Sequence, residues 1–166
     1  SRTGDVDLRG AVISSDRILI EAAGSLLGGA SLTSANDIGV TVGDSLTAAS
    51  IVTGGELTTA AEVGGGPEGF YSVPGSITVG EITVGTGNVD YSAGGAIDLG
   101  TLTVSSSDIR LTAGGAINLG GTNGATSIGL FGGSVAAGSL DAGGLIEIES
   151  GSDVTLGTAT AGSELR

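Results

Sequence analysis

The chain of 166 residues contains no cysteine, histidine, lysine, methionine or tryptophan. Without cysteine it has no disulfide and no thiolate chemistry. Without histidine as well, it cannot build the usual serine or cysteine nucleophile systems, or a zinc or copper site of the usual kind. No run of about 18 apolar residues is present, so we expect neither a membrane-spanning helix nor insertion into a membrane.

Aromatic residues and positive charges are both scarce. Two phenylalanines and two tyrosines are the only aromatic residues. A globular core of this size ordinarily uses several large rings, so we expect a core narrow enough for aliphatic side chains to fill. Five arginines oppose 18 acidic residues, which gives a net charge of −13. This balance argues against binding to nucleic acid or to anionic membranes, because both require a basic surface.

Glycine is abundant, with 34 residues, but neither collagen nor disorder explains it. Collagen requires glycine at every third position, and this spacing is absent. Disordered chains have low hydrophobicity, whereas the mean hydropathy here is +0.40. We therefore interpret the glycines as turn residues in a folded chain.

A repeat of 20 residues organises the sequence. Residues 88–107 and 108–127 share the pattern Ala-Gly-Gly-Ala-Ile-x-Leu-Gly, and residues 16–35 and 36–55 fit the same frame. Apolar residues that open short alternating runs are spaced by 8 and then 12 positions, with shorter steps near the end. These residues are Val6, Ile18, Leu26, Ile38, Leu46, Leu57, Ile77, Val89, Ile97, Ile109, Ile117, Ile128, Val135, Ile146 and Val154.

The alternation and the repeat together predict a parallel β-helix. Alternation with a period of two, in runs rich in β-branched residues, indicates strands with one buried face. A hairpin meander is less suitable, because the turns lack the Asn-Gly and Asp-Gly pairs that tight hairpins prefer. Stacking equivalent residues in parallel places like on like. We predict one all-β solenoid over residues 1–166, with about 20 residues per coil and seven to eight coils, roughly 40 Å long at the usual strand spacing.

Asparagine and aspartate recur at equivalent positions near the coil corners. An asparagine beside an aspartate donates a hydrogen bond along the stack, whereas two aspartates would repel each other. We therefore interpret these residues as corner chemistry, with a chain of Ca²⁺ sites as the alternative. The expected stacked pairs are Asn88 with Asp108, Asp98 with Asn118, and Asp16 with Asn36.

The motif Asp-Ile-x-Leu-x-Ala-Gly-Gly-x-Ile-x-Leu-Gly resembles the repeats of filamentous haemagglutinins, the large exoproteins of bacterial two-partner secretion. The resemblance covers most of the chain and is clearest over 88–120. It implies a right-handed β-helix, export through an outer-membrane transporter, and a role in adhesion or display. The secretion domain of that family is missing here, so the match concerns the shaft alone and transfers no functional residue.

Residues 62–76 interrupt the repeat and contain both prolines, Pro67 and Pro74. Insertions in a solenoid leave it at a corner, and such loops often carry function. We expect a loop here whose Glu68, Phe70 and Tyr71 form a contact site for a receptor or glycan. The alternative is that the two rings cover an exposed side of the helix. A second irregularity, 121–133, contains Phe131, which we expect to fill a gap in a coil with altered packing.

Two further functions are alternatives to a structural role. Glu147 and Glu149 alternate onto one strand face, as do Asp5 and Asp7, and paired carboxylates occur in polysaccharide-cleaving enzymes. Those enzymes build a groove with longer coils, so we expect no catalytic site. An ice-binding face needs regularly stacked threonine. Thr78, Thr83, Thr101, Thr103 and Thr155 are scattered, so we regard this alternative as weak.

The sequence therefore predicts a non-catalytic shaft or adhesion segment of a large secreted or cell-surface bacterial protein. The chain begins Ser1-Arg2 without methionine, and we expect it to be a piece of that larger protein. No cofactor or metal is expected. The expected partners are an outer-membrane transporter during export, and then a host receptor, a glycan or a neighbouring cell surface. The alternative is a fibre subunit that associates end to end with copies of itself, because no polar capping helix is apparent at either end.

Overall fold

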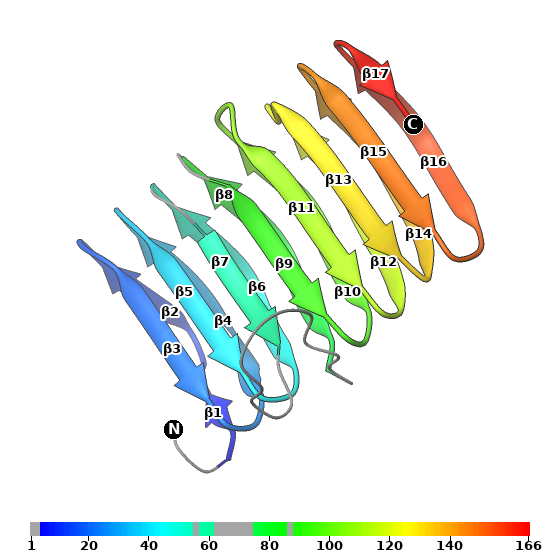
Figure 1. The fold of residues 1–166 in the computed structure, drawn as a ribbon. Coiled ribbons are helices and arrows are strands. Elements are labelled where there is room, and N and C mark those ends of the chain that lie inside the picture. Colours follow the sequence, from blue (N-terminus) through cyan, green and yellow to red (C-terminus); the bar gives the residue numbers. More distant parts are fainter. Residues whose placement is uncertain (1–3, 55–56, 62–74, 86–87) are drawn as a thin grey trace, which may run out of the picture.

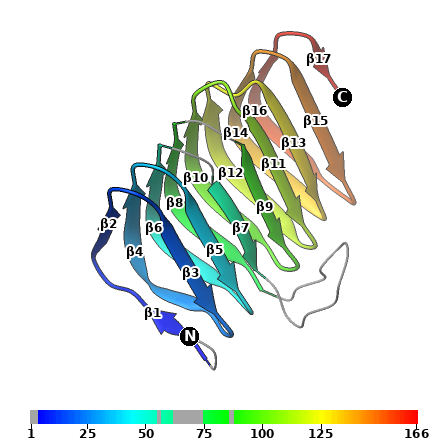
Figure 2. The same ribbon diagram turned by 60° about the vertical axis from the view of Figure 1, so that its left-hand side comes forward.

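The protein is a stack of parallel β-strands (Figure 1), described by a computed structural model over residues 4–54, 57–61, 75–85 and 88–166. The chain alternates between two sheets as it advances, and β1 and β17 lie at opposite ends of the stack. Figure 2 shows the two sheets facing each other across the core. No helix occurs in these described ranges. The predicted all-β solenoid is thus confirmed, with about seven turns.

Each turn after the first contributes one long strand to sheet A and one shorter strand to sheet B, and the first turn contributes the two short strands β1 and β2 to sheet A. Sheet A contains β1 (Val6–Asp7), β2 (Ala11–Ser14), β4 (Leu26–Ser34), β6 (Leu46–Thr53), β8 (Ile77–Val84), β10 (Ile97–Val104), β12 (Ala116–Asn123), β14 (Ser134–Ala142) and β16 (Val154–Ala161). Sheet B contains β3 (Ile18–Ala22), β5 (Ile38–Val42), β7 (Leu57–Ala61), β9 (Val89–Ala93), β11 (Asp108–Ala113), β13 (Ser127–Gly132), β15 (Leu145–Ser150) and β17 (Glu164–Leu165).

The apolar residues that open the runs of the repeat form two continuous columns. In sheet A, Ile97 pairs with Ile77 on one side and with Ile117 on the other. In sheet B, Val89 pairs with Ile109. The alternating spacing of 8 and 12 is explained by this arrangement. Eight residues lead from a strand of sheet B to the next strand of sheet A, and twelve bring the chain back.

The longer half of each coil contains a corner that the sequence analysis did not identify. In β10, Leu99 and Leu102 both face the core, while Gly100 and Thr101 between them both turn away from it. The inside–outside alternation therefore shifts by one residue, as it does where a strand bends. Leu102 and Val104 are 0% and 3% exposed and give the core a third side.

A column of glycines makes this corner possible. A Cβ atom built on Gly100 would overlap the carbonyl oxygen of Gly80, and one built on Gly138 would overlap that of Gly120. Successive coils approach too closely here for any side chain between them. The members of this glycine column are Gly80, Gly100, Gly120, Gly138 and Gly157.

The expected stacking of asparagine and aspartate is confirmed. Each pair joins residues 20 positions apart, in adjacent coils. In two pairs an asparagine amide donates to an aspartate carboxylate: Asn36 donates to Asp16 at 3.0 Å, and Asn118 donates to Asp98. In the third pair the Asp108 backbone N–H donates to Asn88 Oδ1 at 3.1 Å. Alternating an amide with a carboxylate turns a column that would repel itself into one that is hydrogen-bonded.

Serine hydroxyls join the coils at another corner and keep the register where the repeat is interrupted. The Ala96 backbone N–H donates to Ser76 Oγ at 3.0 Å across 20 residues. The Ser76 N–H donates to Ser45 Oγ at 3.1 Å, although these residues are 31 positions apart. Accordingly, Leu46 pairs with Ile77 as it pairs with Leu26 on its other side. The stack thus stays in register between β6 and β8.

We predict that Gly100→Ala destabilises the protein. The new methyl group would meet a backbone oxygen that cannot move without shifting a whole coil, so we expect a loss of about 1–3 kcal/mol in the free energy of unfolding. Gly143→Ala is the matched control, because its Cβ would lie 3.9 Å from its nearest neighbour, the Ala125 carbonyl oxygen. Urea denaturation measures both variants. Equal stability of the two would contradict the close approach of coils at the glycine column.

We also predict that Ile117→Asp unfolds several coils. Ile117 is 0% exposed between Ile97 and Val135, so the variant loses apolar contacts and buries an unpaired charge. The cost should exceed the about 2–5 kcal/mol of an isoleucine-to-alanine change. Thermal melting followed by circular dichroism measures it. Ala136→Asp, on the outer face of the neighbouring strand, is the control. An unchanged melting temperature for Ile117→Asp would show that the column of residues containing Ile117 is not the core.

Candidate functional site

The contact loop expected from the sequence lies outside the described residues. Glu68, Phe70 and Tyr71 fall within 62–74, between β7 and β8. They stay a prediction, and the candidate site described below consists of other residues.

The acidic pairs that suggested an enzyme are located in different settings. Glu147 and Glu149 both face outward from β15, as the sequence analysis expected. Asp5 accepts a hydrogen bond from the Ser25 backbone N–H at 2.7 Å, so it joins the first coil to the second. Asp7 forms an exposed ion pair with the Arg9 guanidinium at 2.8 Å, which raises the pKa of Arg9. The first pair thus lies at the surface, where Glu147 pairs with Arg166 at 3.2 Å, and both members of the second pair have partners within the first coils.

The alternative of Ca²⁺ sites at the coil corners requires clusters of acidic side chains, and the described ranges contain none. No three acidic side chains converge there as a cation site would require. The corner aspartates Asp16 and Asp98 instead accept hydrogen bonds from asparagine amides.

Threonine stacks in part of the outer surface. Thr103 lies beside Thr83, but Thr101 lies beside Glu81 and Thr78 beside Asp98. Between β8 and β10, then, only one of these three pairs consists of two threonines. A regular threonine array of the kind that ice binding needs is interrupted by charge at this position.

The outer face of sheet B contains the most distinctive cluster in the described residues. Phe131 points outward from β13 and is half-buried. A Cβ atom on Gly129 would lie 2.8 Å from the Phe131 ring, so the ring occupies the space that a side chain at 129 would fill. The Arg110 guanidinium, from the adjacent β11, lies over this ring with its carbon 5.3 Å from the ring centroid. We call Arg110, Gly129, Phe131 and Glu147 the Phe131 cluster.

The sequence analysis expected Phe131 to fill a gap, and the ring does so on the outside of the solenoid. Its neighbour Leu130 faces inward and is 0% exposed, which places Phe131 on the opposite face. The ring covers the backbone at Gly129, where the column of outward side chains is interrupted. Aromatic side chains that cover a glycine in a neighbouring position are a known way of stabilising a sheet.

Two hollows flank the Phe131 ring. The first, of about 210 Å³, lies over Gly129 between Arg110 and Glu147. The second, of about 310 Å³, lies on the other side of the ring beside Glu149 and Ser150. Phe131 lines both hollows and therefore separates them.

Charged and polar groups of both signs border the first hollow. Arg110 lies on one side, and Glu147 lies on the other, where it pairs with Arg166 at 3.2 Å. At the edge of the hollow, the Ser127 hydroxyl donates to the Asp108 carboxylate at 2.6 Å. The site thus offers guanidinium donors and carboxylate acceptors around an apolar wall.

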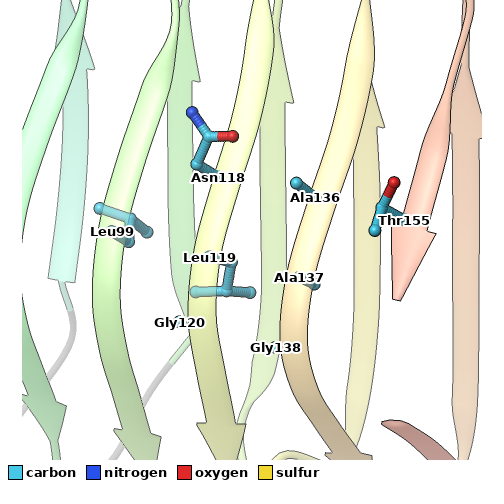
Figure 3. A pocket seen from close by; sticks show the side chains of 8 residues that line it. All are labelled: Leu99, Asn118, Leu119, Gly120, Ala136, Ala137, Gly138 and Thr155. Atoms are coloured by element: carbon cyan, nitrogen blue, oxygen red, sulfur yellow. The ribbon is translucent and has the colours of Figure 1, made fainter. Parts of the chain in front are cut away.

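A third hollow, of about 310 Å³, lies on the outer face of sheet A and is open to solvent. Figure 3 shows that it lies where side chains are short or missing, at Gly120, Ala136 and Gly138. The Asn118 amide at its border is already bonded to Asp98. This hollow is the outer surface of the glycine column and offers no convergent functional groups.

The Phe131 cluster was not predicted from the sequence, because the alignment of its residues depends on coils shorter than 20 residues. Arg110 pairs with Gly129, which pairs with Glu147, and these steps are 19 and 18 residues rather than 20. The shortened spacing of Ile109, Ile128 and Ile146 contained this information. Counting one residue on from each of these would have placed the three cluster residues in one outward column.

Comparison of the chain with protein-family models, with curated proteins and with solved structures finds no match. Within the described ranges, no helix is long and apolar enough to cross a membrane.

Proposed function

We propose that this chain is a structural, non-catalytic shaft segment of a large bacterial protein that is secreted or held at the cell surface. The segment keeps an adhesive surface extended and takes part in adhesion through its lateral faces. The resemblance of its repeats to filamentous haemagglutinins supports this proposal, and the proposal includes the export through an outer-membrane transporter that the resemblance implies.

The observation that carries the proposal is the use of polar side chains along the stack. Asparagine amides, serine hydroxyls and threonine hydroxyls bond to residues in the neighbouring coil. These polar side chains fix one coil on the next. Each coil then depends on its neighbours, as expected for an extended, stiff element.

Acidic surface charge fits the same role. A net charge of −13 keeps a long, apolar-cored rod soluble and discourages lateral clumping. It also disfavours nucleic acid as a partner.

We predict that the shaft accepts an additional coil. A second copy of residues 97–116 inserted after Ala116 should fold and lengthen the rod by about 4.8 Å, because Ile97 and Ile117 are equivalent positions. Small-angle X-ray scattering measures the length, and thermal melting measures the stability.

A half-coil insertion is the matched control for the additional coil. Repeating residues 97–106 alone would place strands of sheet A where sheet B should continue, and it should destabilise the fold. A full-coil variant that unfolds, or one that is no longer than the parent, would contradict the role of a shaft built from interchangeable coils.

A second candidate function, end-to-end assembly, is favoured by the terminal coils. Val154 is 47% exposed and Leu165 is 52% exposed, although their column neighbours Val135 and Ile146 are 2% and 0% exposed. At the other end, Val6 is only partly buried. These edges accept a further coil, which either a longer chain or a second copy of this one can supply.

The register specifies how two copies would stack. Continuing the columns places Val6 on Val154 and Ile18 on Leu165. The same register brings Arg17, one position before Ile18, opposite Glu164. Apolar columns and opposite charges would then continue across the junction.

We predict concentration-dependent association of the 166-residue chain in sedimentation velocity experiments. Val154→Asp should suppress this association, because a charge would replace an apolar contact at the junction. Ala136→Asp, which changes an outward side chain of β14 away from the junction, should leave it intact. Glu164→Arg should weaken association, and adding Arg17→Glu should restore it. A single monomeric species at all concentrations would exclude assembly.

A further inference from the structure

The Phe131 cluster interrupts the regular outer surface of sheet B. The chain has no lysine, and between Arg17 and Arg166 it has one arginine, Arg110. That single arginine lies against Phe131, and Tyr91, the other aromatic residue in the described ranges, is 0% exposed in the core. The one described aromatic ring at the surface and the one mid-shaft cation are therefore in contact.

The groups around this ring match the chemistry of a sugar. A sugar ring presents an apolar face of C–H groups and a rim of hydroxyls that both donate and accept hydrogen bonds. The first hollow provides apolar surface from Phe131 and Leu145, and acceptors from Asp108 and Glu147. An ionised carboxylate accepts from more than one hydroxyl, and the Arg110 guanidinium donates to hydroxyl oxygens.

Other ligand classes fit less well. Sites for free drug-sized molecules are enclosed and hold about 300–1,000 Å³. The first hollow is smaller, at about 210 Å³, and it is open, so it suits one unit of a longer chain. Sulfated or carboxylated polysaccharides would approach a protein with a net charge of −13 and meet Glu147 and Glu149 directly.

The two hollows suit two units of one linear chain. Gly129 in the first hollow and Gly132 in the second are three residues apart on β13, or about 10 Å at the usual rise of a strand. The second hollow has Glu149 and the Ser150 hydroxyl as its polar groups. An oligosaccharide lying along β13 would meet a carboxylate on each side of the Phe131 ring.

We propose that the Phe131 cluster binds a linear oligosaccharide that has neutral or amino sugars and no acidic groups. This proposal rests on the proposed function, because it names the ligand through which a lateral face of the shaft would adhere. Binding at one open site is weak, and repeated display of the shaft on a surface raises the effective affinity by multivalency.

The test is a titration of the ¹⁵N-labelled 166-residue chain with cellotetraose, maltotetraose and chitotetraose, followed by NMR. We expect at least one of these probes to shift the backbone amides of Gly129, Phe131 and Gly132. Glu147→Gln and Glu149→Gln should each weaken binding at least threefold, and Phe131→Leu at least fivefold. Ser92→Ala, in the same outward column two coils away, should bind as the parent does. Heparin should leave these amides unshifted.

Several outcomes would overturn the site. If no probe shifts these amides, or if the two glutamine variants bind as tightly as the parent, the cluster only covers Gly129. A preference for heparin would overturn the choice of an uncharged ligand. Because the glutamate changes are at the surface, folding defects do not obscure these results.

The outcomes also separate this site from the proposed function. A chain that accepts the additional coil but binds no oligosaccharide leaves the shaft function intact and removes the site. Release of new reducing ends from a bound probe, abolished by Glu147→Gln, would instead overturn the non-catalytic function while keeping the binding site.

Discussion

The coil-to-coil register, which places each inward residue on its equivalent one coil away, is the constraint on which the rest of the structure depends. Ile77, Ile97 and Ile117 form one such run, and Val89 and Ile109 belong to another. Like side chains at strand spacing pack with little empty space, so a narrow core needs few large rings. A slip of one residue would turn each strand's apolar face to solvent, which strongly favours this register.

The backbone makes this register possible at the corners. The glycine column lets successive coils approach where the long strands bend, because no side chain separates the Gly80 oxygen from Gly100. Hydrogen bonds from side chains then fix the remaining corners, with amide on carboxylate at Asn118 and Asp98 and with hydroxyls at Ser45 and Ser76. Apolar packing and corner chemistry therefore specify the same alignment, as expected of a sequence that folds to one structure.

Much of this could be predicted from the sequence because it repeats. The 20-residue offset predicted the pairing of Ile97 with Ile117, and the same offset predicted the hydrogen bond between Asn36 and Asp16. The third side of the core was missed because Leu102 and Val104 follow a shift in alternation at Gly100-Thr101, which interrupts a simple period of two. The Phe131 cluster was missed because contacts between outward side chains depend on coil length, which varies near the end. Residues 62–76 were predicted to contain the contact site, at Glu68, Phe70 and Tyr71, and that prediction stays open.

The pairing of Leu46 with Ile77 has a consequence for engineering. One step of the stack contains 31 residues where its neighbour contains 20, and the strands on both sides keep their alignment. The strands of this protein therefore keep their register whether 20 or 31 residues separate equivalent positions. The corner at Gly114-Gly115 also leads from a strand of sheet B to the next strand of sheet A, so it is a suitable place to graft a foreign peptide, which would be held at a fixed height along a stiff support. A series of such grafts at successive corners would form a molecular ruler, with marks about 4.8 Å apart.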